Sequence, residues 1–367
     1  MNRKPKVAII GTRGIPNHYG GFEQLAEFLS VGLVEKGYEV TVYNSSQHPY
    51  QEATWNGVNI ISCKDPEYLP STFGQFAYDL NCINDSRKRD FDVILQLGYT
   101  SSTVWYWRFP KSAQIVTNMD GLEWKRSKYN WPVQQFLKVA EWLGAVTSDL
   151  LIADSIGIQD YLKKKYNKPS EYIPYGAHLF NTPDEEVLSR FDLKPFGYDL
   201  LIARMEPENH VEVVIQGRVE ASSERPLILI GNWKGTAFGQ RLKKQYDHPS
   251  VRFLGGLYDL EALNHLRHYS HLYFHGHSVG GTNPSLLEAM ASNCLIVAHN
   301  NIFNRAILNE DAHFFKTAGE VKELIETVSK TSVDIPQIQA NREKITNRFS
   351  WERIIDEYEA AILKSLS

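Results

Sequence analysis

Residues 277–290 read HSVGGTNPSLLEAM, and this stretch predicts a turn that joins a buried strand to a helix. Two adjacent glycines, Gly280 and Gly281, let the backbone approach a ligand closely. Asn283 suits the helix cap and Pro284 suits the first helical position. The backbone amides and the positive end of the helix dipole then favour an anion such as a diphosphate. A well-capped helix without a ligand is the alternative, although glycines are a poor way to stabilise a helix start.

Short apolar runs alternate with amphipathic helical patterns on both sides of this stretch, as expected of parallel α/β sheets. Expected strands are 6–10, 39–43, 58–62, 92–97, 113–117, 150–153, 200–203, 227–230, 252–254, 272–274 and 295–298. We therefore predict an α/β protein with two Rossmann-like domains, 1–180 and 181–348, and a cleft between them at the carboxyl ends of both sheets. Residues 349–367 are expected to form a helix that packs back on the first domain.

The composition limits the classes of function. A net charge of -4 over 367 residues argues against a nucleic-acid binder, which needs a basic excess. Cys63, Cys82 and Cys294 are scattered and form neither a disulfide framework nor a zinc site, which fits a reducing cytoplasm. The first apolar run is too short for a signal peptide, and none approaches the roughly 18 residues of a membrane span. Any membrane contact is therefore expected to be peripheral.

A second loop, 203–210, reads ARMEPENH and follows the expected strand 200–203. The planar guanidinium of Arg204 suits a phosphate, and an ordinary surface ion pair is the alternative. Glu288 lies just over one turn into the helix after the glycine loop, where it is placed to accept hydrogen bonds from ribose hydroxyls. These segments predict a nucleotide-diphosphate site in the second domain.

The first domain offers two further loops. Residues 11–23 read GTRGIPNHYGGFE, and their glycine spacing differs from the dinucleotide fingerprint. The second expected strand ends near Asn44 rather than at an acid for ribose, which also counts against an oxidoreductase. Residues 116–126 read VTNMDGLEWKR after another expected strand, with Asp120 at its carboxyl end. A structural turn at 11–23 and a capping role for Asp120 remain the alternatives.

Taken together, these segments resemble the family-four retaining glycosyltransferases, which have the GT-B architecture. The likeness is carried by Gly20-Gly21 before the first helix, by Arg204, and by the helix start that runs into Glu288-Ala289-Met290. The finer pattern is similar to a bacterial polysaccharide subgroup that includes rhamnosyltransferases. Two positions depart from the commoner family pattern. Gly280 stands where a glutamate is usual, with His277 as a nearby polar substitute, and Asn209 replaces a lysine.

The resemblance implies a role for each candidate residue. The donor-binding residues would be Gly20, Gly21, Arg204, Asn209, Gly281, Thr282, Asn283 and Glu288. The catalytic residues would be Asp120, Arg204 and His277, and the acceptor-side residues would be Arg13, His18, Tyr19 and Glu123. No metal or cofactor is implied, because helix amides and Arg204 supply the positive field. The Asp90-Phe91-Asp92 motif precedes a strand, away from the expected cleft, so we interpret it as a surface turn rather than a metal site.

The implied reaction transfers a sugar, first of all L-rhamnose from dTDP-L-rhamnose, to a glycan or lipid-linked acceptor with retention of configuration. A nucleotide-sugar epimerase or hydrolase and a non-catalytic nucleotide-sugar-binding subunit are the alternatives. We expect a cytoplasmic protein that touches the inner face of the membrane, or else carries only a solvated loop there. The residues that suggest this contact are Trp124, Lys125, Arg126, Lys128, Tyr129 and Trp131.

Overall fold

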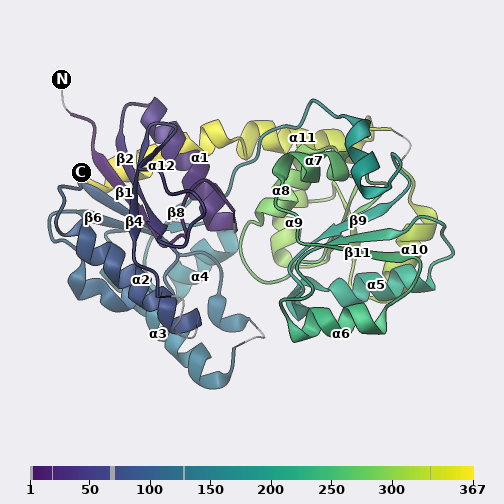
Figure 1. Ribbon diagram of the computed structural model, residues 1–367, viewed down its shortest axis with the longest axis horizontal. Helices are drawn as coiled ribbons and strands as arrows, with labels where there is room; N and C mark the ends of the chain where they lie inside the picture. Colours follow the sequence, from purple (N-terminus) through teal and green to yellow (C-terminus); the bar gives the residue numbers. More distant parts are fainter. Residues whose placement is uncertain (1–2, 19, 67–70, 127–128, 331) are drawn as a thin grey trace. The chain divides into compact units, whose positions relative to one another are not determined.

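The computed structural model describes residues 3–18, 20–66, 71–126, 129–330 and 332–367 (Figure 1). Its contacts divide the chain into two compact units. Unit 1 comprises Met1–Tyr175 together with Trp351–Ser367, and unit 2 comprises Gly176–Ser350. The C-terminal residues therefore belong to the same unit as the N-terminal part of the chain.

Unit 1 is built on one sheet whose strand order, within the described residues, is β3-β4-β2-β1-β5-β6-β7-β8. All neighbouring strands in it are parallel except β3, which runs antiparallel to β4. The strands are β1 Lys6–Ile10, β2 Glu39–Ser45, β3 Thr54–Trp55, β4 Val58–Cys63, β5 Val93–Leu97, β6 Gln114–Asn118, β7 Leu150–Ala153 and β8 Glu171–Tyr172. The helices are α1 Gly21–Glu35, α2 Ser71–Ser86, α3 Trp131–Thr147, α4 Ile156–Tyr166 and α12 Trp351–Ser365, with short turns η1 Thr103–Arg108 and η2 Glu123–Lys125.

Unit 2 contains a fully parallel sheet with the strand order β11-β10-β9-β12-β13-β14 in the described part of the chain. Its strands are β9 Asp199–Ile202, β10 Leu227–Ile230, β11 Val251–Gly255, β12 Tyr273–His275, β13 Ile296–His299 and β14 His313–Phe315. The helices are α5 Val211–Glu220, α6 Ala237–Gln245, α7 Leu260–His268, α8 Pro284–Ala291, α9 Ile302–Leu308, α10 Ala318–Thr327 and α11 Pro336–Arg348, with turns η3 Glu185–Phe191 and η4 Pro207–Asn209. The predicted α/β class is confirmed. The sequence did not indicate the strands β3, β8 and β14, which are two or three residues long.

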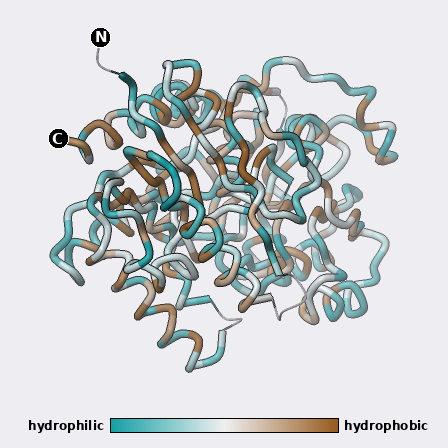
Figure 2. The backbone as a smooth tube through the Cα atoms, turned by 60° about the vertical axis from the view of Figure 1, so that its left-hand side comes forward, coloured by the Kyte–Doolittle hydropathy of each residue, from teal (hydrophilic) through white to brown (hydrophobic). Residues whose placement is uncertain are grey.

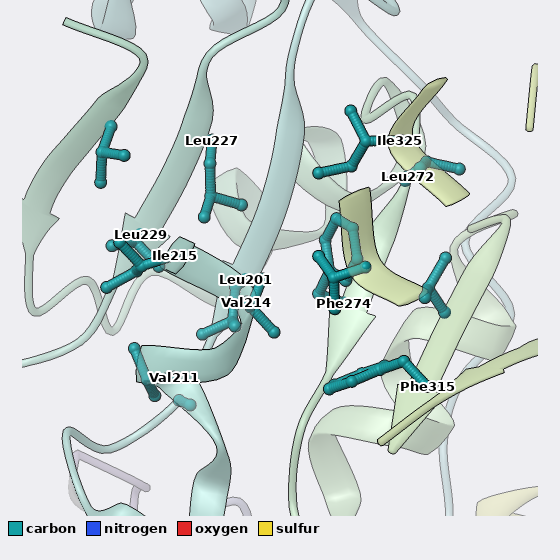
Figure 3. Close-up of a cluster of buried hydrophobic side chains, with 14 of the residues drawn as sticks. Leu201, Val211, Val214, Ile215, Leu227, Leu229, Leu272, Phe274, Phe315 and Ile325 are labelled. Atoms are coloured by element: carbon teal, nitrogen blue, oxygen red, sulfur yellow. The ribbon is translucent and has the colours of Figure 1, made fainter. Parts of the chain in front are cut away.

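The strands are apolar because helices cover parallel sheets on both faces. All five residues of β5 are buried, for example. In unit 2, Leu201, Leu229 and Phe274 of the sheet meet Ile215 of α5 and Ile325 of α10 in one buried cluster (Figure 3). Many of the connecting loops are hydrophilic, as Figure 2 shows. No helix among the described residues is both long enough and apolar enough to cross a membrane.

Helix α12 completes unit 1, where it lies beside α1 (Figure 1). The ring of Trp351 stacks on Phe28 of α1 with 4.7 Å between centroids. Farther along, the carboxylate of Glu359 accepts hydrogen bonds from Lys4 at 3.0 Å and from the Tyr38 hydroxyl at 2.9 Å. These bonds tie the last helix of the chain to the start of β1 and the start of β2.

Two glycines in unit 2 provide a test of its packing. A Cβ at Gly217 of α5 would lie 2.5 Å from Val321 Cβ and 2.6 Å from the backbone oxygen of Ala318, both on α10. Gly217→Ala should therefore lower the free energy of unfolding by about 1–3 kcal/mol through overpacking. The control is Gly319→Ala in the first turn of α10, where only Thr317 Oγ1 would come near, at 4.0 Å. It should be neutral or stabilise by up to about 1 kcal/mol. Equal denaturation midpoints for the two variants would contradict this account of α5–α10 packing.

Candidate functional site

The carboxyl ends of β9, β12 and β13 lie side by side, because β12 pairs in parallel with both of its neighbours. Open α/β sheets bind ligands at this edge. The three loops that leave these strands, residues 203–210, 276–283 and 300–301, are therefore brought to one place in unit 2.

Direct hydrogen bonds join the first two of these loops. The amide of Ser278 donates to the carbonyl oxygen of Glu208 at 3.1 Å, and the Ser278 hydroxyl donates to the same oxygen at 2.8 Å. The His210 ring binds the carbonyl oxygen of Gly276 at 2.8 Å. A Cβ at Gly276 would collide with the carbonyl oxygen of Asn209, so only glycine permits this close approach. The two loops therefore form one rigid edge.

The end of β13, the loop after it and the start of α9 hold the other side of the glycine loop. The side-chain amides of Asn301 and Asn304 both donate to the carbonyl oxygen of His277, at 3.0 and 3.1 Å. The ring of His299 stacks on that of His210 with 3.7 Å between centroids. Three strand ends are thus cross-connected around His277.

Burial sets the charge of the histidines at this edge. It lowers the pKa of His275 well below its ordinary value, and it lowers the pKa of His299 to about 4 with a further effect from His210. Both rings are therefore neutral near neutral pH. The two ring nitrogens of His275 are buried and, within the described residues, have no hydrogen-bond partner. Arg204, by contrast, carries a permanent positive charge on the loop after β9.

Arg204 lies two residues after the end of β9, and its side chain is 63% exposed, with a carboxylate oxygen of Glu206 at 3.9 Å. The guanidinium is therefore accessible from solvent. Asn209 behaves differently, because it is buried and its side-chain amide donates to the Arg204 carbonyl oxygen at 2.9 Å. At the position where the family pattern usually has a lysine, the Asn209 side chain therefore stabilises the conformation of its own loop.

The glycine loop leads into α8 as predicted. The Asn283 side chain accepts a hydrogen bond from the amide of Ser285 at 2.9 Å, and Pro284 begins the helix. Gly280 has φ +120°, in a region that favours glycine, although a Cβ there would meet open space. A glutamate at position 280 would be strained in this loop conformation. Thr282 is buried, and Gly281 is half-buried.

Glu288 of α8 forms an ion pair that the sequence did not indicate. Its partner is Arg267 of α7, the largest fully buried side chain among the described residues. Arg267 also donates to Asn264 Oδ1 at 3.0 Å and to Ser285 Oγ at 3.3 Å. The guanidinium therefore fixes where the Glu288 carboxylate lies. No spacing in the sequence connects the two residues, which are 21 positions apart.

In unit 1, the loop after β1 is held by two carboxylates. Arg13 forms an ion pair with the buried Asp65, and its backbone amide donates to Glu23 Oε1 at 2.7 Å. Burial raises the pKa of Glu23, against the lowering effect of this hydrogen bond. Gly20 caps α1, which begins at Gly21.

The remaining residues of this loop are less constrained. His18 is exposed, and its ring lies nearly perpendicular to that of His48, with 4.3 Å between the ring centroids. Tyr19, another predicted acceptor-side residue, lies outside the described residues.

The loop after β6 holds Asp120 in an uncommon backbone conformation. Its φ is +47°, an uncommon conformation for a residue other than glycine and most accessible to Asn and Asp. The amide of Asp120 donates to Asn118 Oδ1 at 3.0 Å, and the Asn118 side chain donates to the Tyr358 hydroxyl of α12 at 2.8 Å. Glu123 binds Arg126 at 2.6 Å. The C-terminal helix therefore supports the turn that carries Asp120.

Asp92 of the Asp90-Phe91-Asp92 motif accepts a hydrogen bond from the Lys6 amide at 2.6 Å and pairs with Arg3 at 3.2 Å. It thus fastens the beginning of β1. Within the described residues, no group of three or more His, Cys, Asp or Glu side chains is arranged to hold a metal ion.

A protein-family model described as a domain of unknown function (DUF1972) matches residues 4–178, and no curated protein matches the sequence. Among solved structures, the chain is similar to sucrose-phosphate synthase from Thermosynechococcus elongatus, with a TM-score of 0.82, 15% identity and 99% of each chain covered. It is also similar to HepE of Anabaena in complex with UDP-glucose, at a TM-score of 0.72 and 14% identity over 98% of this chain and 99% of that one. WaaG, a glycosyltransferase involved in lipopolysaccharide biosynthesis, gives a TM-score of 0.72 and 12% identity over 97% and 99%.

The chain has the GT-B fold. This is the architecture that the sequence resemblance implied, and the likeness covers nearly the full length of each structure. Within unit 2, the fold places the loop of Arg204 and Asn209 beside the loop of His277 and the two glycines. It adds Arg267, which sequence reasoning missed. Asn118 and Tyr358 were likewise missed in unit 1.

The Arg267–Glu288 pair predicts different stabilities for three site variants. Glu288→Ala leaves a buried guanidinium without its carboxylate, so the free energy of unfolding should fall by about 3–5 kcal/mol. Glu288→Gln keeps an acceptor oxygen and should cost about 1–3 kcal/mol. Arg204→Ala removes an exposed side chain and should stay within about 0.5 kcal/mol of the parent. Denaturant unfolding of the full chain measures all three. A Glu288→Ala variant as stable as the parent would mean that the pair contributes nothing to the fold.

Proposed function

We propose that this chain is a glycosyltransferase that moves a sugar from a nucleotide-sugar donor to a glycan or lipid-linked glycan acceptor. The observation that carries the proposal is the joined edge of unit 2, where exposed Arg204 and the capped start of α8 leave neighbouring strands. A guanidinium fork and a helix N-terminus together suit a diphosphate. The GT-B fold supports the assignment, as does the likeness to an Anabaena protein in complex with UDP-glucose.

The proposed reaction retains the anomeric configuration, as the resemblance to family-four enzymes implies. The acceptor hydroxyl attacks the anomeric carbon from the face that the diphosphate leaves. Its oxygen bonds to that carbon, the bond from the carbon to the diphosphate oxygen breaks, and the proton passes to the departing phosphate. Arg204 and the amides at the start of α8 stabilise the charge that develops on the diphosphate. No protein nucleophile or metal ion takes part in this scheme.

The other candidate residues divide between the two substrates. Glu288, held by Arg267, is proposed to bind the ribose, and His277 is proposed to contact the sugar. Asp120 orients the reacting hydroxyl of the acceptor. The three cysteines are buried and unbridged, which supports a place in the reducing cytoplasm.

We propose a 6-deoxy sugar as the donor, with dTDP-L-rhamnose first. Two polar groups of the commoner pattern are missing here. The Asn209 side chain points to the backbone of its own loop, where it binds the Arg204 carbonyl oxygen. The positive φ of Gly280 disfavours the usual glutamate at that position. A site with fewer polar contacts suits a sugar with one hydroxyl fewer, because an unpaired buried polar group costs about 1–3 kcal/mol.

Arg204→Ala should weaken donor use by roughly 10- to 150-fold in kcat/KM, the equivalent of about 1.5–3 kcal/mol for a lost charge-assisted hydrogen bond. The matched control is Arg190→Ala, because Arg190 is also exposed in unit 2 but pairs with Asp259, far in sequence from the site loops. Steady-state kinetics with varied donor make the measurement. Similar kinetics for both variants would remove Arg204 from the donor site.

Asp120→Asn should lower kcat more than it weakens donor binding, because the carboxylate acts on the acceptor hydroxyl. Asparagine also accepts a positive φ, so the turn should persist. Asp192→Asn is the control, since Asp192 is exposed and has φ +52°. Transfer rates and nucleotide binding are measured separately. If Asp120→Asn transfers sugar at the parent rate, Asp120 has only a structural role.

The proposed function as a whole is tested with a panel of dTDP-, UDP- and GDP-sugars and lipid-linked glycan acceptors, in the presence of EDTA. We expect donor-dependent thermal stabilisation and transfer that is fastest from dTDP-L-rhamnose, with a product of unchanged anomeric configuration by NMR. Faster transfer from UDP-glucose or GDP-mannose would refute the donor. An inverted product would refute retention, and activity restored only by manganese would refute metal independence.

Two outcomes of the same panel would favour other functions. Rapid turnover of the donor without an acceptor would indicate an epimerase or hydrolase. Donor binding without transfer to any acceptor would indicate a non-catalytic nucleotide-sugar-binding subunit.

A further inference from the structure

Helix α3 is apolar on both its inner and its outer face. Leu137, Ala140 and Ala145 are buried against the rest of unit 1. The opposite face is exposed and still apolar, with Trp131 at 71% and Trp142 at 49% exposure. Phe136, Val139 and Val146 are the other large exposed side chains of this helix. A surface helix normally presents polar residues to water, so the outer face of α3 is unusual for a helix in contact with water alone.

The exposed surface continues onto η1. Phe136 of α3 packs edge-on against Phe76 of α2 at 5.4 Å, and the carbonyl oxygen of Phe76 accepts a hydrogen bond from the Trp105 indole. Trp105 in turn contacts Trp107, which is 59% exposed and lies 5.3 Å from the ring of the exposed Tyr106. We call this surface the aromatic face, and its members are Tyr106, Trp107, Trp131, Phe136, Val139, Trp142 and Val146.

Basic residues lie at two sides of the aromatic face. Lys138, one turn before Trp142, and Lys125 both lie over the Trp124 ring, at 4.7 and 5.4 Å from its centroid. At the end of η1, Arg108 bonds to the Asn84 side chain, and Arg87 bonds to the Arg108 carbonyl oxygen. In the part of the chain that the structure describes, none of these four cations is paired with a carboxylate.

Acidic groups are absent from the exposed face of α3. The single acid of this helix, Glu141, is buried and accepts hydrogen bonds from the Trp124 indole at 3.0 Å and from Lys165 at 2.8 Å. The hydroxyls of Tyr161 and Tyr166 bind the same carboxylate. The surface therefore offers an apolar centre and a positive margin.

We propose that the aromatic face docks on an anionic lipid bilayer. Tryptophan and tyrosine concentrate at the membrane interface, where a polar edge and an apolar ring are both accommodated. Lysine and arginine beside them reach the phosphate groups of anionic lipids. The charge of the margin is thus complementary to an anionic bilayer, since the one carboxylate of α3 is buried and bound to Lys165.

This surface differs from the loop that the sequence suggested. The Trp124 indole is bound to Glu141, and Arg126 is bound to Glu123. Lys128 lies outside the described residues. Lys125 and Trp131 remain available, and α3 and η1 provide most of the apolar area.

The test is flotation of the full chain with vesicles, without any sugar donor, so that it is independent of glycosyl transfer. The vesicles contain phosphatidylcholine alone or mixed with phosphatidylglycerol. We expect binding to the mixed vesicles only. The pair Trp131→Ala and Trp142→Ala should lower the bound fraction at least about tenfold, and Lys125→Glu with Lys138→Glu should do the same.

Matched control changes are Tyr258→Ala and Ile302→Ala, which remove large side chains that are 68% and 74% exposed in unit 2. They should leave binding unchanged, and all variants should keep the parent's unfolding midpoint. Absence of vesicle binding, or equal loss in the control variants, would overturn the proposal. If light scattering shows that the parent chain is a dimer and that the tryptophan variant is a monomer, the aromatic face binds a second copy of the chain instead.

Discussion

The carbonyl oxygen of Glu208 accepts hydrogen bonds from both the amide and the hydroxyl of Ser278, and the candidate site depends on this joint. It fixes the loop after β9 to the loop after β12. The close approach is possible because Gly276 has no Cβ to meet the backbone of Asn209. With the two loops joined, the backbone that carries Arg204 and the loop that leads into α8 are held at one edge of the sheet before any ligand binds.

The same edge shows how polar groups are distributed in a parallel sheet. Helices cover both faces, so the strands themselves are apolar and the polar residues collect where the strands end. Some of those residues face outward, as Arg204 does. Others, such as Asn209 and Asn301, hold the loops in place, and Arg267 of α7 holds Glu288 of α8. The departure from the familiar sequence pattern at 209 therefore has a structural counterpart in the loop.

Unit 1 supports its loops in a different way, by using the far end of the chain. Tyr358 of α12 binds Asn118, and Asn118 holds the amide of Asp120 in its unusual conformation. The same helix binds Lys4 and Tyr38 through Glu359. Removal of the C-terminal helix would thus affect both the packing of α1 and the turn that carries Asp120. The packing of unit 1 leaves one apolar surface exposed, the face of α3 that carries Trp131 and Trp142.

The sequence by itself determined the α/β class, most of the strands and the loops that carry Arg204, Asp120 and the glycines. Local signals are sufficient for these features: short apolar runs, glycine pairs, an Asn-Pro helix start, and the order of motifs along the chain. The sequence did not indicate the Arg267–Glu288 pair, the Asn118–Tyr358 bond or the exposed face of α3. Each depends on which residues distant in the chain are packed together or left uncovered, and side-chain periodicity reports only which faces of an element are apolar. Whether an apolar face is buried or exposed is decided by the elements packed against it, and only the tertiary structure contains that information.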